Sequence, residues 1–506
     1  MTVEPRAAYD ELLTRSRRQA LLGSCSAVLG WDEQTYMPSG GAGLRGDQMA
    51  LLAGLQHAQA TETRIGELIA TVAGSGLAAD PDSEPAANLR EISRDYQRRL
   101  KLPQSLVEEL AKTTSLAQSE WVSARAANDF ARFQPWLDRI FELKRQESAC
   151  LREGPGSAYD PLLDEYEPGA KASVLDALFR ALKAELAPLV QAVVERSRGS
   201  NGEAILNRFY PRDRQRVFAE AVAAGVGFDF TRGRLDVTPH PFCSGFGPGD
   251  CRITTRFDEH HFSDAFYGVL HEVGHGLYEQ GLEPARFGTP LGEAVSLGVH
   301  ESQSRLWENA VGRGEAFWRY WHPLAKRVFH ESLGDVSLPA FRAAVNHVQP
   351  SLIRVRADEA TYNLHIIARF ELERALLEGD LAVADLPGAW NDQYRELLGV
   401  VPASDAEGCL QDIHWSAGLI GYFPTYTLGN LYAARLYQQA RAELGDLDSA
   451  FAAGDFGGLL GWLRGKIHRH GRRYRPADLI DRAAGPGDHS PLMASLRTKY
   501  EELFGL

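Results

Sequence analysis

The sequence predicts a mainly α-helical protein, and two observations support that class. Long stretches at both ends are rich in Ala, Leu, Glu and Arg, which are strong helix formers, whereas runs of β-branched residues are scarce. Apolar residues make up 44% of the 506-residue chain, which is enough for a sizeable core. Because no linker rich in Pro, Ser or Gly divides the chain, we expect one domain over residues 1–506.

Apolar residues recur at helical spacing along the first half of the chain and indicate long helices packed together. The expected ranges are 9–29, 48–73, 86–100, 105–128, 136–153, 171–197 and 211–224. Residues 234–239 and 251–257 instead suit strands, and 244–249 between them suit a turn. The sequence therefore predicts a small antiparallel hairpin. Its edge could pair with an extended peptide, although a purely structural hairpin explains the pattern equally well.

Charge and cysteine content exclude several classes of protein. The balance of 54 Lys and Arg against 67 Asp and Glu gives a net charge of −13, which argues against binding to nucleic acid or an anionic membrane. Five cysteines without C-x-x-C spacing indicate neither a disulfide framework nor a thiolate zinc site. We see no secretory signal and no apolar run near the roughly 18 residues of a membrane span. We therefore expect a cytoplasmic protein.

The strongest functional signal is His271-Glu272-Val273-Gly274-His275. Residues 262–279 have helical apolar spacing, and positions four apart on a helix share one face. Two imidazoles on that face can hold one metal ion, and Glu272 can act as general base toward a water molecule without being a ligand. Although such a short pattern also arises by chance, it indicates a zinc hydrolase.

A catalytic zinc site needs a third protein ligand and leaves one further position for water. The candidates that follow the motif are Glu279, Glu293, His300, Glu301 and Glu308. Residues 295–309 look helical, so Glu301 could face the motif helix while Val295 and Val299 pack toward the interior. Geometry alone does not decide whether Glu301 or Glu293 is the third ligand.

Several motifs, in order along the chain, resemble the signatures of the carboxypeptidase Taq family of metallopeptidases. Besides residues 271–275 they are 31–38 (WDEQTYMP), 240–242 (HPF), 250–254 (DCRIT), 300–306 (HESQSRL), 353–359 (IRVRADE), 408–415 (GCLQDIHW) and 421–426 (GYFPTY). The resemblance implies a large helical metallopeptidase fold with a deep substrate groove, and a homodimer. It also implies release of single amino acids from peptide C-termini with broad specificity. By the same resemblance Glu301 is the third zinc ligand, and Co²⁺ or Mn²⁺ could occupy such a site.

An enzyme that acts at a free C-terminus must bind a carboxylate, which calls for a fixed cation. Arg354 and Arg252 lie in matching motifs and are the candidates. Arg354 is the first choice, and we expect it to open a helix that carries Asp358, Tyr362 and His365 on successive turns. A structural ion pair is the alternative for either arginine.

The resemblance assigns His414 and Tyr426 to the developing oxyanion, with Tyr422 as a close competitor. His240, placed on the first predicted strand, could bind substrate or could be a turn residue. Asp358 and Glu359 could fix the ring of a metal-binding histidine.

The mechanism that these residues imply is attack by a water molecule that zinc acidifies while Glu272 takes its proton. Peptides with a free C-terminal carboxylate are the expected substrates. An oligoendopeptidase or a dipeptidyl carboxypeptidase of the same helical class is the nearest alternative, because these share the ligand set. A non-catalytic peptide-binding scaffold is another, although Glu272 argues against a merely structural metal site.

Overall fold

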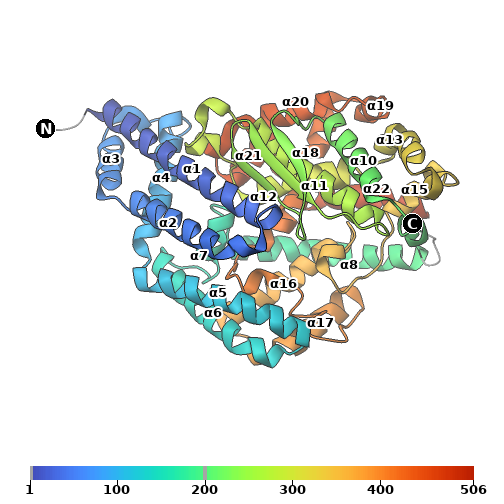
Figure 1. Ribbon diagram of the computed structural model, residues 1–506, viewed down its shortest axis with the longest axis horizontal. Helices are drawn as coiled ribbons and strands as arrows, with labels where there is room; N and C mark the ends of the chain where they lie inside the picture. The colour runs from blue at the N-terminus through green and yellow to red at the C-terminus, as the bar shows by residue number, and fades with distance from the viewer. Residues whose placement is uncertain (1–3, 198–201) are drawn as a thin grey trace. The chain divides into compact units, whose positions relative to one another are not determined.

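The computed structural model describes residues 4–197 and 202–506, and it is mainly helical with one three-stranded sheet (Figure 1). The predicted fold class is therefore confirmed. The described helices include none that is both long and apolar enough to cross a lipid bilayer.

The chain divides into two compact units, each assembled from three separated segments. Unit 1 comprises residues 1–100, 201–345 and 436–486, and unit 2 comprises residues 101–200, 346–435 and 487–506. Because the chain passes repeatedly between the units, neither could be cut out as one continuous piece. The expectation of a single domain over 1–506 stays a prediction.

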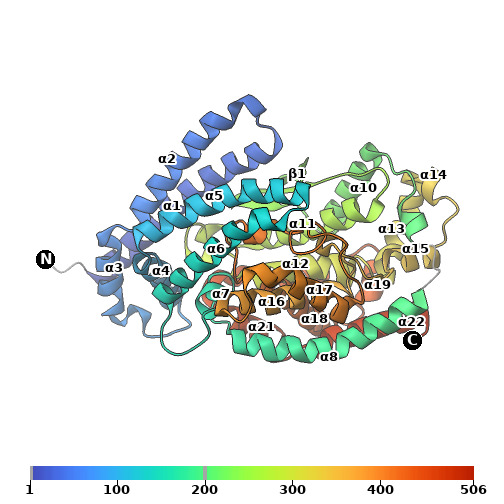
Figure 2. The same cartoon turned by 90° about the horizontal axis from the view of Figure 1, so that it is seen from below.

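Unit 1 holds the sheet and the motif helix. Its helices are α1 (Pro5–Thr35), α2 (Ala42–Ala60), α3 (Thr63–Ala73), α4 (Glu84–Lys101), α9 (Gly202–Leu206), α10 (Arg212–Gly225), α11 (Phe262–Gly281), α12 (Leu297–Arg305), α13 (Glu315–Val328), α14 (His330–Leu333), α15 (Leu338–Val345), α19 (Leu447–Ala452), α20 (Gly457–Lys466) and α21 (Pro476–Ala484). Helices α1 and α2 run side by side (Figure 2).

Unit 2 has helices and loops but no strand among its described residues. Its helices are α5 (Gln104–Ala127), α6 (Phe130–Leu151), α7 (Asp160–Tyr166), α8 (Ala172–Ser197), α16 (Tyr362–Glu378), α17 (Leu386–Leu398) and α22 (Ser490–Phe504), and α18 (Pro424–Leu444) starts here and ends in unit 1. Most expected helices are present within a few residues of their predicted ends. The range 48–73 was wrong as one helix, since it is interrupted between α2 and α3.

The sheet differs from the predicted hairpin. Strands β1 (Gly233–Val237) and β3 (Asp250–Thr255) pair, but in parallel, and β2 (Cys243–Gly247) pairs antiparallel on the other side of β3. The glycine-rich run read as a turn is therefore largely a strand. The Glu279 carboxylate packs against this strand at Gly245: a Cβ there would lie 2.2 Å from Glu279 Oε2, so a larger residue would displace that side chain.

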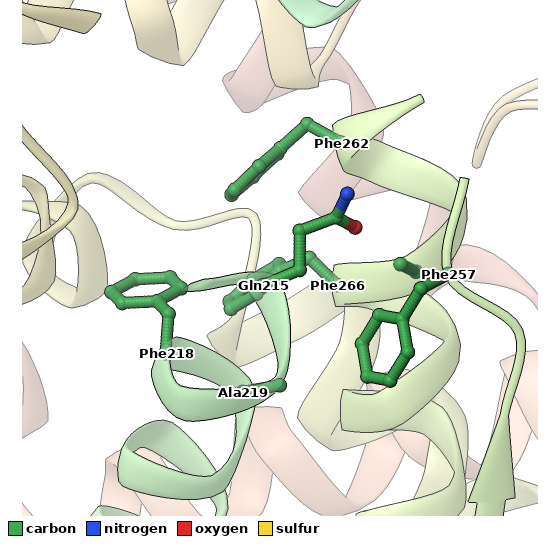
Figure 3. Close-up of a pocket in the computed structure, with 7 residues that line it drawn as sticks. Gln215, Phe218, Ala219, Phe257, Phe262 and Phe266 are labelled. Carbon is green, nitrogen blue, oxygen red and sulfur yellow. The ribbon is translucent and has the colours of Figure 1, made fainter. Parts of the chain in front are cut away.

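The first half of α11 is anchored in an aromatic core of unit 1. Phe262 and Phe266 stack with ring centroids 5.3 Å apart, and Phe218 of α10 lies 5.5 Å from Phe266. Figure 3 shows these rings beside Gln215, whose amide donates to the carbonyls of Tyr210 and Asp258. The space between them leaves no room for a water molecule. Such aromatic pairs each add about 0.5–1.5 kcal/mol beyond burial, so the start of the motif helix is held firmly.

Candidate metal centre and active site

Helices α11 and α12 place the three proposed metal ligands together. His271 and His275 share one face of α11, with ring centroids 4.8 Å apart. Glu301 of α12 points its Oε2 at both rings, 3.6 Å from His271 Nε2 and 3.4 Å from His275 Nε2. All three donor atoms lie within 4.8 Å of one another. The structure thus brings together the residues that the sequence proposes as metal ligands.

The donor atoms suit a divalent cation. His271 Nδ1 lies 2.9 Å from Glu308 Oε2, and a neutral ring that donates from Nδ1 to this carboxylate has its lone pair on Nε2. Burial raises the pKa of Glu301, but Arg305 and the two histidines outweigh it, so this pKa lies well below its usual range. Zinc bonds of about 2.0–2.1 Å at tetrahedral angles imply ligand atoms about 3.3 Å apart, close to the separations between Glu301 and the histidines.

Glu301 is held so that only one oxygen faces the histidines. Arg305 Nε donates to Glu301 Oε1 at 2.7 Å, and Ser304 Oγ lies 3.1 Å from Oε2. Arg305 also contacts Glu308 Oε2 at 3.2 Å. Glu308 lies in a π-helical segment, η5 (Leu306–Val311), that continues α12. Such segments are frequent at functional sites, and this one presents Glu308 to His271.

Gly274 lets α11 and α12 approach through their backbones. A Cβ at this position would lie 2.5 Å from Ser304 Cα and 2.6 Å from the Gln303 carbonyl oxygen. Since backbone atoms cannot move aside as a flexible side chain can, any larger residue must push the helices apart. Glu301 stands on the helix that would move.

We expect Gly274→Ala to lower the free energy of unfolding by about 1–3 kcal/mol and to weaken metal binding, because it overpacks this contact. Chemical denaturation and a metal competition assay would measure the two effects. Gly268→Ala is the matched control on the same helix, since its Cβ would meet only Thr255 Oγ1 at 3.8 Å. The control should be neutral or slightly stabilising. Equal results for both variants would contradict the close-approach argument.

Glu272 lies beside the two histidines and is 7% exposed. Burial raises its pKa to about 7, although the charge of His271 opposes the shift. A carboxyl group with a pKa near neutrality can both accept and release a proton, which is what a general base and subsequent acid must do.

The partners of the histidine rings differ from those predicted. Asp358 instead accepts the backbone N–H groups of Ala360 and Thr361, and Glu359 pairs with Lys499 in unit 2. The side chains that contact the rings are Glu308 at His271 and His300 at His275. The sequence did indicate that Glu279 lies near these histidines, because it follows His275 by four residues and so continues the same face of the helix.

The other candidate third ligands have separate partners. Glu293 is exposed and accepts from Arg472 Nη1 at 3.0 Å. Glu279 contacts His300 Nε2 at 2.8 Å. Helix geometry alone had left Glu293 as an alternative third ligand. In the structure the carboxylate beside the two histidines is Glu301, not Glu293.

Unit 2 holds Arg354, one of the two candidates for binding the substrate carboxylate, and the candidates for the oxyanion. Arg354 is 5% exposed and forms a two-pronged pair with Asp412, with Nε–Oδ2 3.1 Å and Nη2–Oδ1 2.8 Å. The His414 ring lies 5.6 Å from Tyr422 and 6.4 Å from Tyr426. Burial lowers the pKa of His414 to about 3, so its imidazole is neutral.

The local structure at Arg354 differs from the expected helix. Arg354 lies in a short 3-10 turn, η6 (Arg354–Arg356), and α16 begins only at Tyr362. Between them the Asp358 carboxylate accepts the backbone N–H groups of Ala360 and Thr361, which forms a turn before α16. Tyr362 still reaches Arg354, because its hydroxyl lies 3.1 Å from Arg354 Nη1.

Arg252 and His240 belong to unit 1. Arg252 lies on β3, as predicted, and donates to both oxygens of Asp250 at 2.9 and 2.8 Å. Its guanidinium lies 4.3 Å from the Trp31 ring centroid. The prediction that His240 lies on the first strand was wrong, since β1 ends at Val237 and His240 is exposed in a bend. Both candidate arginines thus form the ion pairs that the sequence left as an alternative.

A helical fold that presents an H-E-x-x-H helix and a nearby glutamate defines a metallopeptidase. Comparisons with known proteins identify the family: the model of the carboxypeptidase Taq (M32) metallopeptidases matches residues 11–500. This chain belongs to that family and is a metallocarboxypeptidase, a hydrolase that acts on peptides. The predicted resemblance is confirmed, and the family implies a divalent metal.

Named relatives agree over nearly the whole chain. Thermostable carboxypeptidase 1 of Thermus thermophilus is 48% identical, covering 99% of this chain and 100% of that protein. Carboxypeptidase 1 of Bacillus subtilis is 37% identical, covering 94% and 95%. The crystal structure of the M32 carboxypeptidase from Deinococcus radiodurans R1 is 42% identical, with a TM-score of 0.95 over 99% of this chain and 100% of that chain.

Proposed function

We propose that this enzyme is a zinc carboxypeptidase that releases single amino acids of broad identity from peptides with a free C-terminal carboxylate. The observation that carries the proposal is the cluster of His271, His275 and Glu301 with buried Glu272 beside it. Two neutral imidazoles and one carboxylate would hold the metal and leave its net charge positive. Zinc, when bound, supplies Lewis-acid chemistry.

In the proposed mechanism Glu272 accepts a proton from the attacking water and delivers it to the amine nitrogen that leaves. The raised pKa of Glu272 supports both steps. His414 and Tyr426 donate hydrogen bonds to the developing oxyanion, with Tyr422 as the alternative phenol. The neutral state of His414 is compatible with donation, because a neutral imidazole carries one N–H.

Arg354, together with Arg252, binds the terminal carboxylate in this proposal. A guanidinium has five N–H donors. The hydrogen bonds of Arg354 to Asp412 and to Tyr362 engage three of them, and those of Arg252 to Asp250 engage two. Donors therefore remain on each side chain for a substrate. His240 and Tyr422 are proposed as further contacts with the peptide.

The first test is mass spectrometry of an N-terminally blocked peptide and its C-terminally amidated copy, each incubated with zinc-loaded enzyme. We expect the free acid to shorten by one residue at a time and the amide to be spared. Dipeptides or internal fragments would contradict single-residue release. If both peptides stayed intact, the protein would be a peptide-binding scaffold without peptidase activity. Arg354→Gln and Arg252→Gln, run in parallel, should lower kcat/KM for the acid about 10- to 100-fold for whichever arginine binds the carboxylate.

We also propose a homodimer that acts in the cytoplasm. Leu44, Leu51 and Leu55 lie on one face of α2 and are 67%, 66% and 46% exposed, which supports a surface that a second copy could cover. The five cysteines carry free thiols, as a reducing compartment allows. Light scattering tests the dimer, because the mass in solution should be twice that of one chain.

A further inference from the structure

His275 has a second ring nitrogen that faces away from the proposed metal, and it meets an unusual partner. His275 Nδ1 lies 2.5 Å from His300 Nδ1, and His300 Nε2 lies 2.8 Å from Glu279 Oε1. We propose that Glu279 and His300 form a positioning relay that fixes the tautomer and ring orientation of His275 for metal binding. The inference rests on the proposed ligand set.

The proton positions along the relay follow from its carboxylate end. An ionised Glu279 can only accept, so His300 Nε2 must carry its ring's proton. In the proposed relay His300 is neutral, so its Nδ1 is the acceptor and His275 Nδ1 donates to it. His275 therefore keeps a free lone pair on Nε2, the nitrogen that faces Glu301 Oε2. One carboxylate thus selects the tautomer of a ring that it does not touch.

Packing on both members keeps the relay in place. Glu279 extends from α11 onto β2, where its carboxylate packs against Gly245, and a Cβ at that position would displace it. The His300 ring lies between two others, 4.6 Å from His275 and 5.2 Å from Tyr278 between centroids. The side chains of His300 and Glu279 are only 18% and 22% exposed. The His300 ring therefore has little freedom to turn.

The two proposed histidine ligands are therefore supported differently. His271 donates directly to a carboxylate, Glu308, which Arg305 also contacts. His275 reaches its carboxylate, Glu279, only through the neutral ring of His300. Removing His300 should consequently release His275 while His271 keeps its own partner.

The test measures zinc affinity by competition with a chromophoric chelator, without any peptide. We expect His300→Leu to weaken binding about 10- to 100-fold, as loss of the partner of a metal-binding histidine does. Glu279→Gln should weaken it less, because an amide can donate as well as accept and no longer selects one tautomer. His300→Asn should restore part of the affinity, since its carbonyl can accept from His275.

A double variant distinguishes the relay from two independent effects. If Glu279 acts only through His300, Glu279→Gln should have no further effect on zinc affinity in the His300→Leu background. The visible absorption of the Co²⁺-loaded protein should change in the His300 variants, since the orientation of a ligand ring changes. Glu293→Gln is the matched control, because that exposed carboxylate pairs with Arg472 and should leave affinity and spectrum unchanged.

Unchanged zinc affinity in both single variants, or additive losses in the double variant, would overturn the relay. Thermal unfolding of the metal-free proteins shows whether a loss arises from misfolding, and His300→Asn remains informative if His300→Leu does not fold. Relay-dependent zinc binding without release of amino acids would contradict the proposed function alone. Normal carboxypeptidase activity with relay-independent zinc binding would contradict the relay alone.

Discussion

Glu272→Gln is expected to abolish most turnover, with kcat about 10²- to 10⁴-fold lower, while the metal stays bound. The amide has nearly the same shape as the carboxyl group, so the buried site beside His271 should tolerate it. It cannot accept a proton from water, and no later proton transfer to the leaving amine can follow. Metal content after dialysis and kcat for a free-acid peptide would be measured together.

The control for this variant is Glu283→Gln, which makes the same change at an exposed position just beyond α11. Its activity should equal that of the wild type. Retention of more than a tenth of the wild-type kcat by Glu272→Gln would contradict the role of Glu272 as general base. Loss of metal together with activity would instead indicate that the carboxylate supports the ligands.

Sequence reasoning reached the motif helix and its two histidines because their spacing is local. The apolar stripe of residues 262–279 and the i, i+4 histidines are both set by the geometry of one helix, and α11 has both. The third carboxylate is a different matter. Helix geometry did not decide between Glu301 and Glu293 as the third ligand, because the periodicity of a sequence does not specify the distance between two helices. In the structure, Gly274 sets how closely α12 approaches α11.

Errors arose where glycine or a capping side chain had more than one possible role. The run from Ser244 to Gly249 has the composition of a turn, yet most of it forms β2, because its backbone pairs antiparallel with β3. Asp358 looked like a partner for a histidine ring but accepts the N–H groups of Ala360 and Thr361 in the turn before α16. The true ring partner, His300, stands next to Glu301 in the sequence, where no periodic pattern marks it.

The second large effect is expected at Asp412, the buried partner of Arg354. Arg354 and Asp412 side chains are 6% and 8% exposed, and Arg369 Nη1 lies 3.8 Å from Asp412 Oδ2. Burial raises the pKa of Asp412, but Arg354 outweighs it and holds that pKa well below its usual range. The stabilisation is therefore complete above about pH 4, the unfolded pKa of an aspartate, and is lost only as the pH falls toward the lower folded value.

Asp412→Asn should lower the free energy of unfolding by about 3–5 kcal/mol at neutral pH, since it leaves Arg354 buried without a counter-charge. Asp392→Asn is the matched control: its pair with Arg395 is 75% and 59% exposed and should contribute about 0–1 kcal/mol. Urea denaturation compares the stability of the two variants. KM for free-acid peptides should rise only for Asp412→Asn. A loss below 1 kcal/mol for Asp412→Asn would mean that water reaches the guanidinium, and a mobile Arg354 could then leave Asp412 to bind substrate.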